Sequence, residues 1–511
     1  MYKVRVLQEI DDRLDAEYYN PAALSTLKKM ENKGTVTTFG SLVNEGYRVV
    51  YHGTDSINGL KDSELLPFLS PTQIDPNGAI SFDDADKLPL YYKERYPKGL
   101  AKVGEILVEV KGNVSKVGIV PLDFPKNLMI SGSLYKATLD PKRADSHYVL
   151  AFLKSRHGQI LKNRLTSNTI INYIAKDALY SIPVIEFGEK AQKYIGDKVR
   201  QAEQLRAWAK RCRGKINDYF DGLFTGISLT KPEHHHTRVS LDILVPRLNA
   251  EYYSDHYTQV EKGLLDRFGK LTTLGRLAPT VRAKVKPAAD CTYKEIGDLD
   301  VGKGAFSSGT FYKYGEVPNN AQRIFDEGDV AVSTRRPNRG AVAVIEESSS
   351  TTFYSVFLAR LKPKNKNFGY WLKEFLRHDA GKLLLLQRCT WTTYPVISED
   401  DIETIPVPEI PNDWDFVARL SRQSVELEAF ATNLTTSAKT LVEALIEGQL
   451  TEQQLIQAQQ ALDDGDNSLD QAILSKLSGE GYGIANATPL FSDIDELYRL
   501  LESAAQAEAE E

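Results

Sequence analysis

The 511-residue chain contains only three cysteines, and they lie far apart, at Cys212, Cys291 and Cys389. No two of them form a CxxC pair, so the sequence offers neither a disulfide framework nor a structural zinc site. We expect all three to be small buried side chains. Apolar runs are also short, because none approaches the roughly 20 residues that cross a bilayer. The first residues carry charges where a signal peptide needs an apolar segment, so we expect a cytoplasmic protein with no membrane partner.

Several enzyme signatures are missing as well. Residues 263–270 come nearest to a nucleotide-binding P-loop, but their glycines have the wrong spacing and no Ser or Thr follows the lysine. Residues 20–23 begin with Asn-Pro but lack the second proline and the aromatic residue of a DNA amino-methyltransferase motif. Ser, His and Cys occur without a triad-like local signature. We therefore expect that the chain is not an enzyme and that it binds no cofactor of its own.

The chain does contain an internal repeat. Five blocks recur in the same order, at offsets of 222 to 234 residues. They are RLDAEYYN and RLNAEYYS, from Arg13 and Arg247; GEILVEV and GDVAVST, from Gly104 and Gly328; LYKATLDP and VFLARLKP, from Leu134 and Val356; FLKSRHGQIL and FLRHDAGKLL, from Phe152 and Phe375; and SIPVIEF and TIPVPEI, from Ser181 and Thr404. Chance does not preserve such an order, so the sequence predicts two homologous halves.

Each half has the same predicted organisation. The GEILVEV and GDVAVST segments alternate with the period of half-buried strands, and the block that follows them has helical spacing. The IPV block predicts a closing strand. The fold class expected is α+β, with two homologous domains of mixed α/β structure.

A long helix is predicted after each IPV block. Apolar residues recur at steps of three and four from Ile195 to Phe220 and again from Phe416 to Leu445. An apolar stripe on a long helix needs a partner, and a duplicated chain supplies one in its other half. We expect the two helices to pack as an antiparallel coiled coil with pseudo-two-fold symmetry. The alternative is that each helix folds back on its own domain.

These patterns divide the chain into six predicted segments. They are globular domains at 1–187 and 241–411, long helices at 188–224 and 412–449, a linker at 225–240 and a C-terminal extension at 450–511. The linker contains three consecutive histidines, at 234–236. We expect them to be exposed and not a metal site, because no carboxylate or cysteine stands at ligand spacing.

The net charge of −6 argues against a nucleic-acid partner at first, because a DNA-binding protein usually presents a basic surface to the phosphates. The charge is unevenly distributed, however. From Thr451 to the end there are thirteen acidic residues and only two basic ones, Lys476 and Arg499, which leaves a net charge of +5 for residues 1–450. The sequence therefore predicts a mildly basic body with an acidic, helical tail. The tail either docks a partner helix or is a solvated appendage.

The repeated blocks resemble the specificity (S) subunits of type I restriction-modification systems. The resemblance rests on the DAEYY and NAEYY openings, on the strand-turn-strand after GEILVEV and GDVAVST, and on an IPV block that enters a long helix, and it covers about residues 1–450. It implies two target-recognition domains, each recognising one half of a bipartite site in double-stranded DNA, in a phage-defence complex. It also implies that the helices dock two methyltransferase subunits, and that a separate restriction and translocase subunit drives translocation and cleavage.

Candidate DNA contacts are the basic, amide and hydroxyl side chains near turns at equivalent places in the two halves. The strand-turn-strand supplies Lys111, Asn113, Ser115 and Lys116 in the first half and Arg335, Arg336, Asn338 and Arg339 in the second. The stretch after the helical block adds Arg164, Asn168 and Thr169 in the first half and Arg388, Thr390 and Trp391 in the second. Arginine suits guanine and asparagine suits adenine, so different residues at one turn are what two different half-sites require. Taken singly, each is equally well explained as a solvated turn residue, and Trp391 as a buried one.

Three further interpretations stay open. Tyr18, Tyr19, Tyr252 and Tyr253 repeat between the halves, and we expect them to wedge one domain against a neighbour and not to act in function. Glu109 and Lys111 have the acid-x-lysine spacing of metal-dependent nucleases, although residues 333–335 keep no acid, so a stand-alone nuclease is one alternative function. A DNA-binding adaptor of another defence assembly is the other.

Overall fold

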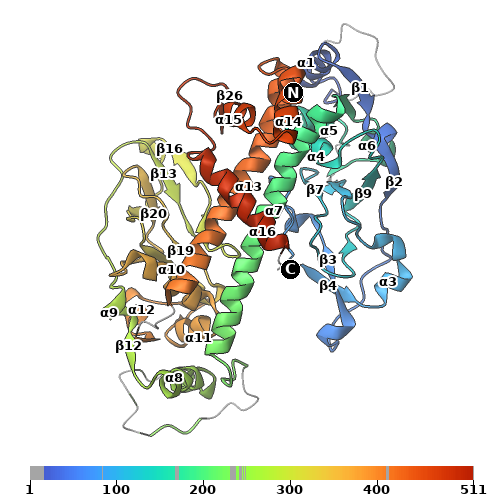
Figure 1. Cartoon of the computed structure of the whole chain (residues 1–511). Helices are drawn as coiled ribbons and strands as arrows, with labels where there is room; N and C mark the ends of the chain where they lie inside the picture. Colours follow the sequence, from blue (N-terminus) through green and yellow to red (C-terminus); the bar gives the residue numbers. More distant parts are fainter. Residues whose placement is uncertain are drawn as a thin grey trace. The chain divides into compact units, whose positions relative to one another are not determined.

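Figure 1 shows the computed structural model of the chain, which describes residues 16–82, 85–166, 172–230, 237–240, 244, 247, 249–409 and 414–509. Unit 1 takes its residues from Met1–Trp208 and Leu427–Glu511, and unit 2 from Ala209–Glu426. Helices alternate with small sheets in both units, so the predicted mixed α/β class is confirmed. None of the described helices combines the length and the hydropathy of a membrane-spanning segment. The histidines at 234–236 lie outside the described ranges.

The central sheet of unit 1 is antiparallel. Its strands, in order, are β2 (Val43–Tyr47), β9 (Leu134–Leu139), β5 (Ile106–Glu109) and β7 (Val117–Ile119). The sheet is followed by α4 (Ser146–Lys154) and α5 (Arg156–Asn163). The remaining elements are α1 (Pro21–Glu31), α2 (Phe39–Leu42), α3 (Tyr92–Arg95), α6 (Lys176–Tyr180), and the pairings of β1 (Thr35–Thr38) with β11 (Pro183–Glu186), of β6 (Lys111–Gly112) with β10 (Asn172–Tyr173), and of β3 (Leu65–Leu69) with β4 (Asp86–Pro89) and β8 (Met129–Ile130).

Unit 2 contains the same antiparallel arrangement of three strands, with β18 (Val330–Ser333) between β19 (Val342–Val344) and β21 (Leu358–Leu361). Two helices follow here too, α10 (Lys366–Arg377) and α11 (Asp379–Gln387). The remaining elements are α8 (Asp255–Phe268), α9 (Leu274–Leu277), α12 (Glu399–Glu403), a sheet of β16 (Thr310–Tyr312), β13 (Cys291–Lys294), β20 (Thr352–Ser355) and β17 (Ala321–Arg323), and the pairs β12 (Leu271–Thr273) with β24 (Pro406–Pro408), β14 (Leu299–Asp300) with β15 (Ala305–Phe306), and β22 (Thr390–Trp391) with β23 (Pro395–Val396).

The central strands are more deeply buried than their sequences predicted. The alternation in GEILVEV and GDVAVST predicted half-buried strands, but every residue of β5 and β18 is buried. In unit 2 the reason is that alternate residues enter two different cores. Val330 and Val332 pack in a core with Trp371, whereas Ala331 packs in a second core with Phe325. The period of two is kept, but neither face of the strand meets water.

A glycine is required where consecutive helices meet in each unit. A Cβ atom built on Gly158 would lie 2.1 Å from the carbonyl oxygen of Phe152, and one built on Gly381 would lie 2.0 Å from that of Phe375. No side chain fits at such distances, so the start of α5 can approach the end of α4 only through glycine, and the same holds for α11 and α10. This explains why both repeated helical blocks contain a glycine at this point.

The two predicted long helices are α7 (Glu189–Leu223) and α13 (Trp414–Glu447). Within unit 1, the Arg206 guanidinium of α7 donates to the hydroxyl of Thr435 in α13, at 3.4 Å. Within unit 2, Cys212 Sγ of α7 lies 3.6 Å from Gln423 Oε1 of α13. The last turns of α7 reach the core of unit 2, where the Phe220 ring lies 5.7 Å from that of Trp371. All three cysteines are buried and free, as expected.

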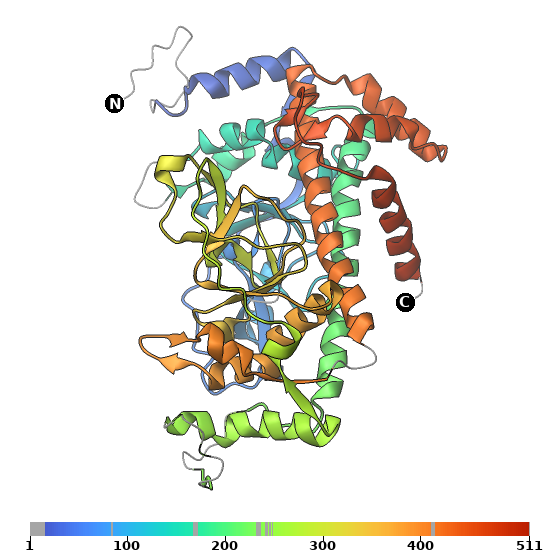
Figure 2. The same ribbon diagram turned by 90° about the vertical axis from the view of Figure 1, so that its left-hand side faces the viewer.

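The C-terminal extension folds onto α7 and α13 within unit 1 (Figure 2). It comprises α14 (Glu452–Asp463), α15 (Ser468–Leu474), the pair β25 (Leu477–Ser478) and β26 (Gly481–Tyr482), and α16 (Ile494–Ala509). The Phe491 ring stacks on Phe430 of α13 at 6.2 Å, and Asn433 donates to the carbonyl of Leu490 at 2.6 Å. The extension is therefore not a solvated appendage. Its apolar side packs on α13 of its own chain.

A buried charge pair anchors the extension. Lys198 of α7 lies 2.7 Å from Asp470 of α15, and both side chains are 1% exposed. The carboxylate of Asp470 also accepts hydrogen bonds from the hydroxyls of Tyr194 and Tyr498. Burial would raise the pKa of Asp470, but the positive charge of Lys198 and these hydrogen bonds hold that pKa below its ordinary value. Asp470 is therefore ionised and fully paired.

Candidate nucleic-acid interface

In unit 1 the turn between β5 and β7 is held from inside by Glu109. This side chain is 4% exposed, and its carboxylate accepts hydrogen bonds from the backbone N–H groups of Asn113 at 3.1 Å, Ser115 at 2.9 Å and Lys116 at 3.1 Å. In a sheet, these N–H groups would donate to the carbonyls of a neighbouring strand, and here the carboxylate accepts their hydrogen bonds instead. Lys111, Asn113 and Ser115 are exposed as a result, and Lys116 is half-buried.

A Glu109→Gln substitution tests this role. An amide has one acceptor oxygen and no charge, so it cannot satisfy three N–H groups as a carboxylate does. We expect the free energy of unfolding of unit 1 to fall by about 1 to 3 kcal/mol in urea denaturation. Glu94→Gln, at an exposed position, is the matched control and is expected to change it by less than about 0.5 kcal/mol. Equal effects of the two substitutions would contradict the role of Glu109.

A buried lysine also supports the turn. The Lys162 ammonium group of α5 donates to the carbonyl of Val114, which has a positive φ of 55°. Burial lowers the pKa of Lys162 to about 8, and burial together with the nearby Lys439 lowers that of Lys154 to about 8. Lys162 thus contacts the turn from inside the unit, and Lys154, at the end of α4, is half-buried.

These lysines predict a pH dependence of stability. The pKa of lysine in an unfolded chain is near 10.4, so between about pH 8 and 10.4 the unfolded chain binds protons that the folded chain does not. The free energy of unfolding of unit 1 is therefore expected to rise as the pH increases from 7.5 to 9.5. A Lys154→Met/Lys162→Met variant should show a smaller rise in urea denaturation at the two pH values. An equal or larger rise in the variant would show that other groups cause it.

In unit 2 the equivalent turn carries three arginines. Ser333 takes the position of Glu109, and its hydroxyl donates to the carbonyl of Arg335 at 2.7 Å. The guanidinium of Arg335 lies over the Phe357 ring at 4.8 Å, and that of Arg336 over the Tyr394 ring at 5.2 Å. Arg336, Asn338 and Arg339 are exposed. No acidic side chain in the described part of the chain pairs with Arg335, Arg336 or Arg339, so their charges are available to an anion.

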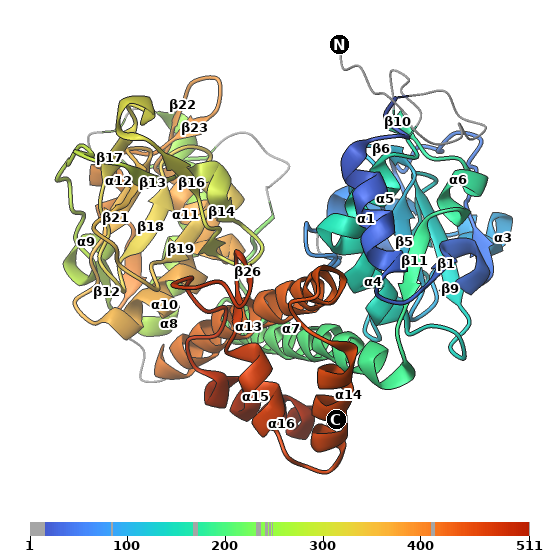
Figure 3. The ribbon, with the colours of Figure 1, turned by 90° about the horizontal axis from the view of Figure 1, so that it is seen from above.

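In each unit the turn lies beside the segment that follows the second helix. In unit 1, β6 pairs with β10, with Lys111 opposite Tyr173. In unit 2, the backbone N–H of Arg336 donates to the carbonyl of Pro395 in β23 at 2.9 Å, and the backbone of Arg335 forms an isolated antiparallel β-bridge with that of Val396. Figure 3 shows β6 beside β10 in one unit and β22 beside β23 in the other. We call this combination of residues 110–116 with 172–173, and of 334–340 with 390–396, the turn edge.

The predicted residues of the second segment divide into three groups. Thr390 and Trp391 are exposed on the turn edge, Trp391 at 50%, so the alternative of a buried tryptophan is wrong. Asn168 and Thr169 lie outside the described residues. Arg164 and Arg388 are buried, at 9% and 4% exposure.

The buried arginines have a structural role that the sequence did not indicate. Arg388 donates to Glu261 at 2.6 Å, and its guanidinium lies 5.9 Å from the centre of the Tyr252 ring. Arg164 lies over the Tyr18 ring at 4.5 Å. Each arginine therefore packs on the first tyrosine of an EYY motif. Their repetition reflects packing within each unit, and neither guanidinium is accessible to a base.

One contact on the turn edge was not predicted. The Arg48 guanidinium lies 5.4 Å from the centre of the Tyr173 ring and donates to the carbonyl of Gly132 at 2.6 Å. Arg48 stands in a segment outside the five repeated blocks, so the repeat could not point to it. It adds a cation beside Lys111.

The structure argues against the nuclease hypothesis, because Glu109, the acid on which that hypothesis depends, has a structural role. The carboxylate of Glu109 is buried and accepts three backbone hydrogen bonds, which leaves it poorly placed to ligate an ion. Within the described ranges, no three or more His, Cys, Asp or Glu side chains gather as metal ligands would. The acid-x-lysine spacing is thus explained by the turn.

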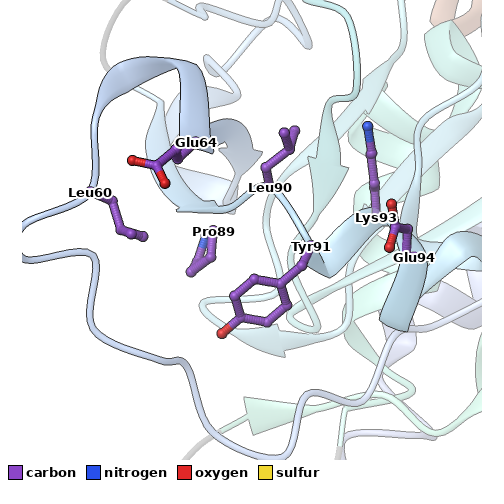
Figure 4. Close-up of a pocket in the computed structure, with 7 residues that line it drawn as sticks. All are labelled: Leu60, Glu64, Pro89, Leu90, Tyr91, Lys93 and Glu94. Carbon is purple, nitrogen blue, oxygen red and sulfur yellow. The ribbon is translucent and has the colours of Figure 1, made fainter.

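A pocket in unit 1 lies away from the turn edge. It is lined by Leu60, Glu64, Pro89, Leu90, Tyr91, Lys93 and Glu94 (Figure 4). Tyr91 is 47% exposed and donates a hydrogen bond to Asp55. The lining contains two acids and one lysine and comes from residues that contribute nothing to the turn edge, so it does not extend that surface.

No protein-family model and no curated protein matches the chain. It is similar to a solved S subunit of a type I restriction-modification system from M. genitalium, with 15% identity, a TM-score of 0.35, and coverage of 83% of this chain and 95% of that one. It is also similar to the HsdS subunit of Thermoanaerobacter tengcongensis, with 13% identity, a TM-score of 0.27, and coverage of 82% and 97%. A third similar structure concerns complex assembly in the type I R-M system, with 13% identity, a TM-score of 0.26, and coverage of 83% and 97%. Over most of its length, the chain is similar to solved chains of type I restriction-modification systems.

Proposed function

We propose that the chain is a non-catalytic DNA-recognition subunit, in which each of the two halves recognises one half of a bipartite site in double-stranded DNA. The observation that supports it best is the turn edge. In both units a turn after a buried strand joins the segment after the second helix, and the joined surface presents amides together with cations that have no acidic partner among the described residues. Phosphate contacts need the cations, and base edges need the amides and arginines.

We further propose that the two halves arose by duplication and that α7 and α13 pack as an antiparallel coiled coil. The matching strand orders around β5 and β18, and the matching glycines at 158 and 381, support the duplication. The contact of Arg206 with Thr435, and that of Cys212 with Gln423, support the antiparallel direction, because the partner number falls as the α7 number rises. The proposed domains remain 1–187 and 241–411, spaced by helices 188–224 and 412–449.

The chemistry is assigned to partner subunits in this proposal. The chain has no methyltransferase or P-loop motif, so two methyltransferase subunits docked on the long helices would methylate the site, and a restriction and translocase subunit would cleave DNA. The chain itself needs no cofactor. The C-terminal extension is not part of the internal repeat, and it covers part of α7 and α13 in unit 1. If the partner subunits are not methyltransferases, the alternative is that the chain is a DNA-binding adaptor of another defence assembly.

The first test is DNA binding by the purified full chain, alone and with any subunit that co-purifies. We expect binding to 50-base-pair duplexes that weakens linearly on a log–log plot against salt, with no cleavage when Mg²⁺ or Mn²⁺ is added. Absence of binding at low salt, both alone and with co-purified subunits, would refute the proposal. Metal-dependent cleavage by the chain alone would replace it with the nuclease alternative.

A further inference from the structure

Arg336 has a backbone conformation that arginine rarely adopts. Its φ is +50°, in the left-handed region. In unit 1 the residue at the same place in the strand-turn-strand is Gly112, with φ +123°, and glycine adopts such angles without strain. Unit 2 thus keeps an arginine where the local geometry favours glycine. Strained residues of this kind persist when the surrounding structure holds them, and they cluster at functional sites.

The surroundings of Arg336 hold the backbone and leave the guanidinium free to bind. The backbone N–H is fixed by the carbonyl of Pro395 at 2.9 Å, and the guanidinium is placed over the Tyr394 ring at 5.2 Å. Among the described residues, no group accepts a hydrogen bond from this guanidinium. Arg323 and Arg360 in the same unit differ, because their guanidinium groups are bonded to Glu399 and to Asp326 and Asp329.

The chemistry of this arrangement selects one kind of ligand. A guanidinium is a planar fork of donors that matches the O6 and N7 acceptors of guanine in the major groove, and an aromatic ring beneath the guanidinium limits the orientations of that fork. A phosphate can also accept from both arms of the fork, but its oxygens accept from many directions, whereas the two acceptors of guanine lie in the plane of the base. Arg339 is exposed on the same turn, and no aromatic ring in the described part of the chain lies beneath it, so it suits a phosphate. Arg335 also lies over a ring, that of Phe357, but it is half-buried and less open to a base edge than Arg336, so we assign it to a phosphate as well.

On this basis we propose that Arg336 is the residue of unit 2 that recognises a guanine, with Tyr394 as its positioning residue, so that the half-site bound by unit 2 contains a guanine that depends on Arg336. The inference rests on the proposed function. It also predicts that unit 1, which has Gly112 at this place, recognises its half-site without such a contact.

The test is selection of the full chain on a library of duplexes with 30 randomised base pairs, followed by sequencing. The wild type is expected to enrich a bipartite motif. Arg336→Lys keeps the charge but loses the fork, so the preference for one guanine in one half-site should fall by roughly 5- to 150-fold while the other half-site stays unchanged. Arg339→Lys is the matched control, and it should leave the motif as it is.

Arg336→Gly separates function from folding. It relieves the strained backbone, so we expect a melting temperature equal to or above that of the wild type, together with the same loss of the guanine. A motif that is unchanged in both Arg336 variants would overturn the assignment while leaving the proposed function in place. If the wild type enriches no motif, both are overturned.

Discussion

Asp470→Asn is expected to lower the free energy of unfolding of unit 1 by about 3 to 5 kcal/mol, because it leaves the ammonium group of Lys198 buried without a counter-charge. The pair is 1% exposed on both sides and joins the C-terminal extension to α7. Urea denaturation measures the loss, and limited proteolysis should show the extension cut before the rest of the chain. Because the folded pKa of Asp470 lies below its ordinary value, this contribution is present above about pH 4 and is lost on acidification.

Two variants sharpen the experiment. Asp463→Asn removes an acid that lies 3.6 Å from Lys193 at the surface, and it should leave the free energy of unfolding nearly unchanged, because solvent screens an exposed pair. Lys198→Met/Asp470→Leu replaces the buried pair with apolar side chains of similar size and should recover most of the stability. A loss in Asp470→Asn no greater than in Asp463→Asn would show that the pair does not anchor the extension.

Arg335→Ala/Arg339→Ala is expected to weaken DNA binding by roughly 10- to 100-fold at 0.1 M salt and to reduce the slope of log affinity against log salt by about 1.8. Each phosphate contact releases about 0.9 counterion, and these two arginines have no acidic partner among the described residues. Fluorescence anisotropy with a labelled duplex over a range of salt concentrations gives both quantities.

Lys262→Ala/Arg267→Ala is the matched control for this measurement. It removes the same charge from the same unit, at exposed positions on α8 that are not among the residues of the turn edge. We expect the slope to stay within about 0.5 of the wild-type value, since only charges at phosphate contacts release counterions. Equal slopes for the two variants would mean that binding follows net charge and not the turn edge.

The sequence predicted the elements that depend on local pattern. The stripes of apolar residues predicted α7 and α13 to within a few residues, because helical periodicity over more than thirty residues is a strong signal. The strand-turn-strand was also placed correctly, and its predicted turn residues are exposed except for Lys116 and Arg335, which are half-buried. Repetition pointed to both segments of the turn edge, which the structure brings together through β6 with β10 and through Arg336 with Pro395.

The sequence could not predict features that depend on contacts between distant segments. Arg164 and Arg388 repeat like DNA contacts, but they repeat because each packs on a tyrosine more than one hundred residues away. The burial of β18 on both faces depends on a second core, formed by residues such as Phe325 and Tyr354, and the short apolar segments of the sequence do not predict that core. The docking of the extension depends on single long-range partners, such as Asp470 and Lys198, that no spacing rule relates.

The central claim is that the two halves recognise the two halves of one DNA site for a methyltransferase. The most direct measurement is a map of methylated bases in the host genome, with and without this chain, and with residues 111–116 exchanged for those of another turn. We predict that a split motif loses methylation when the chain is deleted, and that the exchange alters one half-site only. Methylation that is unchanged on deletion, with no methyltransferase co-purifying, would contradict the account.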